Sequence, residues 1–126
     1  MTQTILVIDD DAYSRMTLQL VLEDAGYAVE CAEDGALGLR AFTAHRPDLV
    51  VTDIIMPARE GLDTIGEIRK IDRKVPIIAV SGGGRLKSTD LLTLAGHLGA
   101  DAVLSKPFAA DELIDTVQRY LALEAP

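Results

Sequence analysis

Five short aliphatic runs alternate with longer segments of helical periodicity along this chain of 126 residues. The runs cover residues 4–9, 28–32, 49–53, 77–81 and 102–105. Their nearly unbroken apolar character is typical of strands that are covered on both faces. Strands that alternate with helices in this way predict βα units, so the expected fold class is α/β with a doubly wound, five-stranded parallel sheet.

The segments between these runs carry the apolar spacing of helices. Residues 18–25 and 91–98 each place apolar side chains at i, i+3, i+4 and i+7, and residues 114–121 give the last helix a buried edge. Gly26 and Gly99 follow the first two stripes, where a left-handed helix cap is expected. Five strand–helix units fill residues 1–126, which predicts a single domain with no output domain attached.

The chain is acidic, with 12 Lys and Arg against 20 Asp and Glu and a net charge of −8. An acidic surface repels phosphate backbones and anionic lipids, so neither nucleic acid nor a membrane is an expected partner. The single Cys31 cannot form an internal disulfide, and the apolar runs are far shorter than the roughly 20 residues that span a bilayer. We therefore expect a cytoplasmic protein.

Polar side chains gather at the predicted ends of the strands. Asp9 and Asp10 close or follow the first strand, and Asp53 ends the third. Ser81 ends the fourth strand, and Lys106 follows the fifth. Because ligands of open α/β sheets bind beyond the carboxyl ends of the strands, these five side chains are expected to converge on one edge of the sheet.

Such a group of side chains is suited to phosphoryl chemistry. Three clustered carboxylates need a compensating cation to remain ionised at neutral pH. Hard oxygen ligands with few protein donors favour Mg²⁺, which commonly bridges to a phosphate. A carboxylate can also attack phosphorus and form an aspartyl phosphate, while the cation and Lys106 neutralise charge on the phosphoryl oxygens.

Four motifs, in this order and spacing, resemble those of the receiver domains of two-component response regulators. The motifs are the acidic stretch 5–11 with Arg15, the stretch 51–57 with Gly61, the stretch 77–82, and Lys106–Pro107–Phe108. The resemblance covers the whole chain. It implies the CheY-like form of the flavodoxin-like fold, a (βα)5 unit with strand order 2-1-3-4-5.

The resemblance also implies a role for each acidic residue. Asp53 is the expected phosphoacceptor. The expected ligands of Mg²⁺ are Asp9, Asp10, Asp53 and the backbone carbonyl of Ile55, with Asp9 acting largely through a metal-bound water.

The remaining site residues are expected to contact the phosphoryl group or to respond to it. Lys106 would pair with it, and Ser81, next to Gly82, would supply the hydroxyl that moves toward it. The Lys106–Pro107 peptide bond is expected to be cis. Val103 stands where the family usually has an aromatic residue that swings inward with the hydroxyl, so signalling by an aromatic rotamer is not expected here.

The implied function is a phosphorylation-controlled switch. A sensor histidine kinase or a histidine phosphotransfer protein would supply the phosphoryl group. The chain would catalyse only its own phosphorylation and dephosphorylation, so it is not expected to be an enzyme toward other substrates. It would signal in trans, as a monomer or weak dimer, to a downstream protein through the face that residues 88–98 and 102–123 form.

Two other functions fit part of the sequence. A small phosphohydrolase of the haloacid-dehalogenase type would use Asp9 as nucleophile and Asp11 as general acid and base. That hypothesis leaves Asp53 and the residues after it unexplained, and Tyr13 stands where that family prefers Thr or Val. A receiver fold that serves as a docking module without phosphorylation is the second alternative.

Overall fold

The computed structural model describes residues 2–53, 60–81, 97 and 99–124. Four of the sequence predictions fall wholly or partly outside these residues: Ile55, Gly82, most of the helix predicted at 91–98, and residues 88–96 and 98 of the predicted output face.

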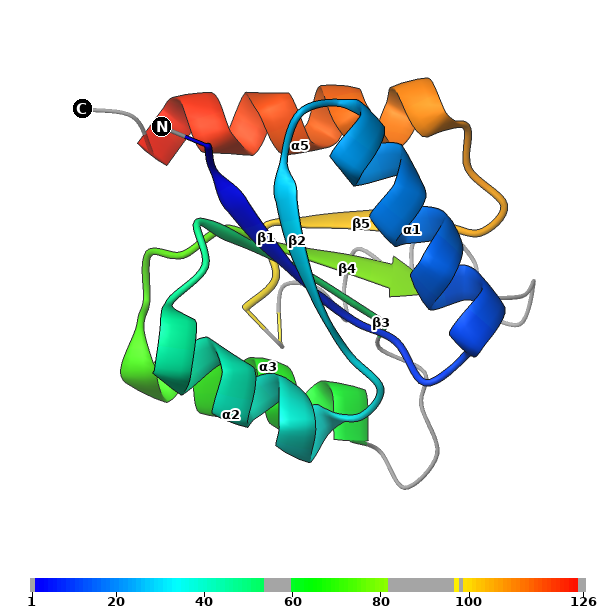
Figure 1. Ribbon diagram of the computed structural model, residues 1–126. Coiled ribbons are helices and arrows are strands. Elements are labelled where there is room, and N and C mark those ends of the chain that lie inside the picture. The colour runs from blue at the N-terminus through cyan, green and yellow to red at the C-terminus, as the bar shows by residue number, and fades with distance from the viewer. Residues whose placement is uncertain (1, 54–59, 82–96, 98, 125–126) are drawn as a thin grey trace.

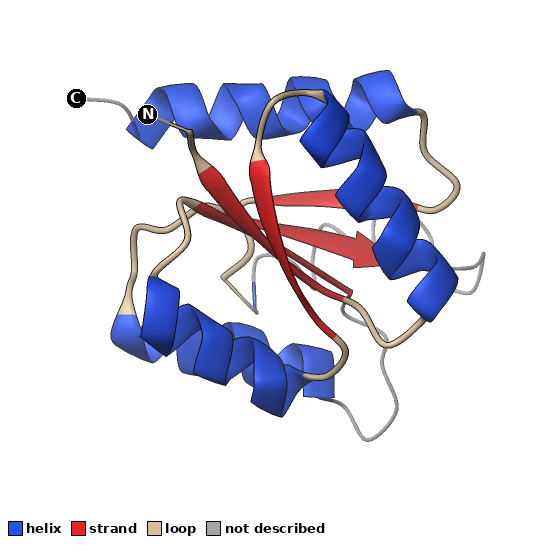
Figure 2. Cartoon of the chain, in the orientation of Figure 1, coloured by secondary structure: helices blue, strands red, loops and turns tan. Residues whose placement is uncertain are grey.

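Five parallel strands form one sheet in the order β2-β1-β3-β4-β5, which confirms the predicted fold class and strand order (Figures 1 and 2). The first strand ends at residue 8, not at residue 9 as predicted. Its pairing with both neighbours stops at Ile8, and Asp9 only donates its N–H to the carbonyl of Ala32 before the chain turns away. The strands are β1 (Thr4–Ile8), β2 (Ala28–Ala32), β3 (Leu49–Asp53), β4 (Ile77–Ser81) and β5 (Ala102–Ser105).

Helices cover both faces of the sheet. α1 (Ala12–Asp24) and α5 (Ala110–Glu124) lie on one face, whereas α2 (Gly35–His45) and α3 (Glu60–Ile71) lie on the other (Figure 1). The carboxylates of Asp11 and Asp34 cap α1 and α2 by accepting hydrogen bonds from backbone N–H groups in the first turns. Gly26 and Gly99 have φ angles of +100° and +90°, the left-handed conformation that the sequence predicted at both positions.

The central strands have no exposed apolar side chains, because each face of the sheet packs into its own core. Leu6 and Ile8 of β1 belong to the core beneath α2 and α3, and Ile5 and Val7 belong to the core beneath α1 and α5. On the first of these faces α2 approaches β1 very closely, since a Cβ atom on Gly38 would lie 2.5 Å from Cδ1 of Ile8. β1 is therefore held firmly on both sides just before the chain reaches Asp9.

Candidate functional site

The carboxyl edge of the sheet collects the acidic residues that the sequence analysis singled out. Asp53 is the last residue of β3, and Asp9 and Asp10 follow β1 directly. One carboxylate oxygen from each of the three lies within 4.8 Å of the others. Asp9 and Asp53 are buried, whereas Asp10 is exposed, so the cluster is open to solvent at Asp10.

Asp9 is the most completely buried of the three and receives three hydrogen bonds on its carboxylate. The backbone N–H of Asp11 donates to Oδ1 at 3.0 Å. The Ser14 hydroxyl and the Lys106 ammonium both donate to Oδ2, at 2.7 and 3.0 Å. Arg15 adds a bond from its guanidinium to the backbone carbonyl of Asp9 at 2.8 Å. These contacts offset the cost of burying a carboxylate and fix its orientation.

Lys106 joins the two buried carboxylates. Its Nζ lies 3.0 Å from Oδ2 of Asp9 and 3.3 Å from Oδ2 of Asp53. Burial alone lowers the pKa of this ammonium, but the hydrogen bond to Asp9 and the negative charge of Asp53 outweigh that effect, so the pKa is raised. Lys106 is therefore a cation at neutral pH.

The position of Lys106 is set by β4 and by the proline that follows it. Its backbone N–H donates to the carbonyl of Ser81 at 2.7 Å, which continues the pairing of β5 with β4 for one more residue. The Lys106–Pro107 peptide bond is cis, the form that the resemblance led us to expect. Ser81 is buried at the end of β4, at the same edge as Asp53.

Among the described residues, negative charge is in excess at this edge. Three clustered carboxylates stand against the Lys106 ammonium and the Arg15 guanidinium, which bonds to the backbone carbonyl of Asp9, and this excess favours a cation. Mg²⁺ binds oxygen ligands at about 2.1 Å, so two of its ligands lie at most about 4.2 Å apart. Three carboxylate oxygens within 4.8 Å of one another need only small adjustments to reach this spacing, and the donor set is the one that Mg²⁺ prefers.

The structure places Val103 away from this cluster. It lies in β5 beside Ala79 of β4 and is half-buried against the core beneath α2 and α3. Ser14 is the residue at the site that the sequence analysis missed. Its position in the first turn of the helix after the acidic motif is a signal, because that turn must fold back over the end of β1.

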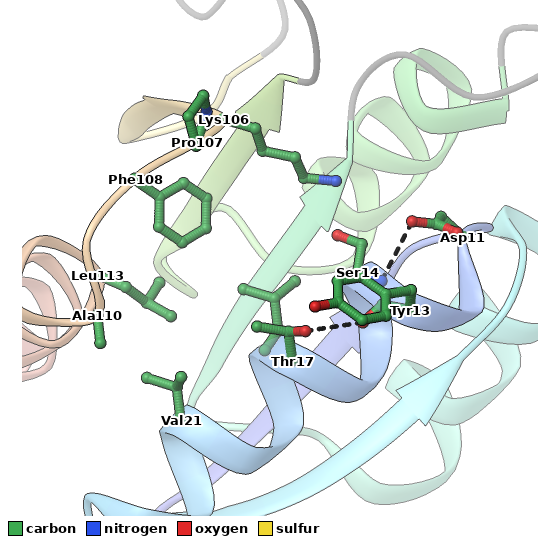
Figure 3. A pocket seen from close by; sticks show the side chains of 11 residues that line it. Asp11, Tyr13, Ser14, Thr17, Val21, Lys106, Pro107, Phe108, Ala110 and Leu113 are labelled. Atoms are coloured by element: carbon green, nitrogen blue, oxygen red, sulfur yellow. Dashed lines mark hydrogen bonds between the residues drawn. The ribbon is translucent and has the colours of Figure 1, made fainter.

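An apolar groove of about 410 Å³ lies next to the cluster, between α1 and the start of α5. Its wall includes Tyr13, Thr17 and Val21 from α1 and Pro107, Phe108 and Leu113 from the opposite side (Figure 3). Lys106 and Ser14 also line it, and Figure 3 shows the Lys106 side chain extending toward the start of α1. The groove therefore ends at the two side chains, Ser14 and Lys106, that donate to the buried Asp9 carboxylate.

The edge thus combines a buried carboxylate at a strand end, a paired lysine and an acidic cluster compatible with a divalent cation, an arrangement suited to phosphoryl chemistry. Residues 5–118 match the response regulator receiver domain, and the chain belongs to that family. The family is the signalling module of two-component systems.

Curated relatives and solved structures agree with this assignment. The chain is 33% identical to sporulation initiation phosphotransferase F of Bacillus subtilis, over 99% of the chain and 98% of that protein. It is 34% identical to the chemotaxis protein CheY of the same organism, over 96% of the chain and 99% of that protein. A receiver domain protein of Clostridium thermocellum superposes with a TM-score of 0.86 at 33% identity, covering 97% of this chain and 96% of that one.

Among the residues that the structure describes, no helix is long and apolar enough to cross a membrane. The family match spans residues 5–118 and so includes Asp53 and its neighbours, which the phosphohydrolase hypothesis left unexplained.

Proposed function

We propose that the chain is a phosphoacceptor switch in which Asp53 takes a phosphoryl group from a phosphohistidine on a sensor kinase or a phosphotransfer protein. The observation that carries this proposal is a pair of contacts made by Lys106. Its ammonium bridges the buried carboxylates of Asp9 and Asp53 at 3.0 and 3.3 Å. That arrangement holds a nucleophile and a cation side by side at the mouth of a partly open cluster.

Phosphoryl transfer to Asp53 exchanges one P–N bond of the donor for one O–P bond. A carboxylate oxygen of Asp53 attacks phosphorus, the new O–P bond forms, and the P–N bond to the donor imidazole breaks. The imidazole nitrogen keeps the electron pair, and the ring leaves neutral because it carries a proton on its other nitrogen or takes one up from solvent. In the reverse direction of the switch, water attacks phosphorus, the O–P bond breaks, and Asp53 returns as a carboxylate with release of inorganic phosphate.

Lys106 supplies the positive charge that the transferring group needs. Its ammonium already lies 3.3 Å from an oxygen of Asp53, so it is close to the three phosphoryl oxygens on which negative charge gathers. Asp9, Asp10, Asp53 and the Ile55 carbonyl would hold Mg²⁺, which when bound neutralises the same oxygens. The chain thereby catalyses its own modification and acts on no other substrate.

The switch itself depends on the hydroxyl of Ser81. A new phosphoryl group on Asp53 offers acceptor oxygens to Ser81 on the neighbouring strand and to Lys106 beyond it. A hydrogen bond to a charged group contributes about 1.5 to 3 kcal/mol, which shifts a two-state equilibrium roughly 10- to 100-fold. Val103 cannot act as an aromatic reporter of that change, so the signal is carried by the hydroxyl and the backbone around it.

This cytoplasmic switch has one surface for the phosphoryl donor and another for the downstream protein. The apolar groove between α1 and α5 is lined at one end by Lys106 and is where the phosphohistidine donor docks, since a donor seated there lies beside that lysine. The downstream protein binds in trans to the face predicted from residues 88–98 and 102–123, of which the structure describes 97 and 102–123, and this binding changes with phosphorylation.

The test is phosphorylation by acetyl phosphate with Mg²⁺, read as the mass of the intact protein. The parent chain should gain one phosphoryl group, and Asp53→Asn should gain none. Asp11→Asn is the matched control, because Asp11 is an exposed helix cap outside the cluster, and it should be labelled like the parent.

Two outcomes would contradict the proposal. Labelling that survives Asp53→Asn but disappears with Asp9→Asn would make Asp9 the nucleophile. A chain whose amide chemical shifts around Asp53 give no saturable response to Mg²⁺ and beryllofluoride would be a docking module that is not phosphorylated.

A further inference from the structure

The Ser14 hydroxyl makes the shortest of the hydrogen bonds to the buried Asp9 carboxylate. Its Oγ lies 2.7 Å from Oδ2 of Asp9, the same oxygen that Lys106 contacts at 3.0 Å. The other carboxylate oxygen, Oδ1, is held by the backbone N–H of Asp11 at 3.0 Å. Ser14 therefore supplies an uncharged side-chain donor to the oxygen that Lys106 shares.

Ser14 reaches Asp9 because of where α1 begins. Asp11 caps the helix, and its carboxylate accepts the backbone N–H of Ser14 at 3.2 Å. This fixes the first turn, so the Ser14 side chain turns back toward the end of β1. The backbone and the side chain of one residue thus tie the helix start to the acidic cluster.

The two donors on Oδ2 help to fix the orientation of the Asp9 carboxylate relative to its neighbours. With Ser14 and Lys106 on one oxygen and the Asp11 N–H on the other, the carboxylate cannot rotate without breaking at least one bond. Its plane is then fixed relative to Asp10 and Asp53, the two acids with which it lies within 4.8 Å. Without Ser14, Oδ2 keeps only the Lys106 contact among the bonds described above. The carboxylate is then held only by the Lys106 ammonium and the Asp11 N–H among these bonds, so its plane is less firmly fixed.

From these contacts we propose that Ser14 is a positioning residue, which orients Asp9 so that the three carboxylates are preorganised for a divalent cation. This inference rests on the proposed function, because it concerns the same site. Ser14 does not touch the reacting atoms and acts only through Asp9. A preorganised ligand set binds more tightly because less freedom is lost when the cation arrives.

The test measures Mg²⁺ affinity of the unphosphorylated chain by following amide chemical shifts during a titration with MgCl₂. Ser14→Ala should raise the dissociation constant for Mg²⁺ about tenfold, the size expected when one hydrogen bond to a carboxylate is lost. Ser14→Thr keeps the hydroxyl and should stay within about twofold of the parent. Ser14→Cys has the size of serine but a weak donor, so it should resemble Ser14→Ala.

Thr17→Val is the matched control. Thr17 lies one turn further along α1 and lines the same groove, but its hydroxyl donates to the carbonyl of Tyr13 and not to the cluster. This variant should bind Mg²⁺ like the parent. A second readout without metal is the ¹³C shift of the Asp9 carboxyl carbon, which should move in Ser14→Ala and stay in place in Thr17→Val.

Mg²⁺ affinities of Ser14→Ala and Ser14→Cys within about twofold of the parent would overturn the inference. Equal weakening in Thr17→Val would also overturn it, because the effect would then belong to the helix and not to the Asp9 contact. Alanine is a strong helix former, so these variants should fold, which circular dichroism checks. The titration involves no phosphoryl transfer, so it separates this inference from the role of Asp53.

Discussion

The two ends of the sheet each hold a group of charged side chains, and they are built in opposite ways. At the carboxyl edge, the Lys106 ammonium contacts the carboxylates of Asp9 and Asp53, and Asp10 completes the acidic cluster. At the amino edge, Arg69 forms an ion pair with Asp101 at 2.9 Å. Its guanidinium also donates hydrogen bonds to backbone carbonyls. The group at the carboxyl edge has excess negative charge, which a cationic ligand can neutralise. The Arg69–Asp101 pair at the amino edge is neutral.

The hydrogen bonds of Arg69 explain why its end of the sheet is structural. Its guanidinium donates to the carbonyls of Gly99 at 2.8 Å and Val75 at 2.7 Å, which joins the end of α3 to the segments that enter β5 and β4. The same Asp101 oxygen that binds Arg69 also accepts the N–H of Ile77 at 2.8 Å. Each of these groups has a partner within the chain, so this end is already satisfied without a ligand.

Removal of Arg69 should have the largest effect on stability. Arg69→Met keeps much of the aliphatic stem but leaves three backbone carbonyls, those of Asp72, Val75 and Gly99, and one carboxylate without the guanidinium. We expect a loss of about 3 kcal/mol in the free energy of unfolding, measured by urea denaturation. The folded variant should still bind Mg²⁺ at the opposite edge with the affinity of the parent. A loss below about 1 kcal/mol would mean that Arg69 does not hold these segments together.

The same substitution of Asp by Asn at the two ends should change stability in opposite directions. Asp53→Asn removes one of three crowded carboxylates and leaves Lys106 paired with Asp9, so the free energy of unfolding without Mg²⁺ should rise by about 1 kcal/mol. Asp101→Asn keeps an acceptor oxygen for Ile77 but weakens the charged bond to Arg69, so stability should fall by about 1 kcal/mol.

Urea denaturation of the two Asn variants beside the parent checks the sign. Addition of Mg²⁺ should stabilise the parent and leave Asp53→Asn nearly unaffected, since the cation then relieves the same repulsion that the substitution removes. A decrease in stability for both variants would mean that the carboxyl edge is as well satisfied as the amino edge.

The sequence predicted the carboxyl edge far better than the amino edge, and the reason is geometric. Parallel strands end at one edge, so residues at five strand ends converge whatever the helices do, and Asp9, Asp53 and Lys106 were found on that basis. Arg69 contacts Gly99 and Asp101, which are 30 and 32 residues away in the sequence. These contacts depend on where α3 ends, and no local sequence pattern indicates them.

Ser14 lies between these two cases. It is only five residues from Asp9, but the contact needs the cap at Asp11 and the turn that brings α1 back over β1. Periodicity predicts that a helix forms here and leaves open which side chain of its first turn points to the strand end. Strand ends can therefore be assigned from sequence, whereas the residues that orient them depend on where each helix begins.

The smallest effect that separates the two ends is a dependence of stability on alkaline pH. Lys106 has a raised pKa in the folded chain, because its contacts with Asp9 and Asp53 outweigh the effect of burial. Its folded form therefore holds the proton more tightly than the unfolded form. The resulting stabilisation is complete below the ordinary lysine pKa of about 10.4 and disappears as pH rises through the folded value.

Urea denaturation between pH 9 and pH 11.5, with Lys106→Met as the comparison, isolates this contribution. The parent should lose more stability than Lys106→Met across that range, since only the parent has the ammonium to lose. Arg69 keeps its charge throughout, so the amino edge contributes no such slope. If the parent and Lys106→Met have the same pH dependence, the lysine is not held by the carboxylates, and the charge imbalance at the carboxyl edge is balanced in some other way.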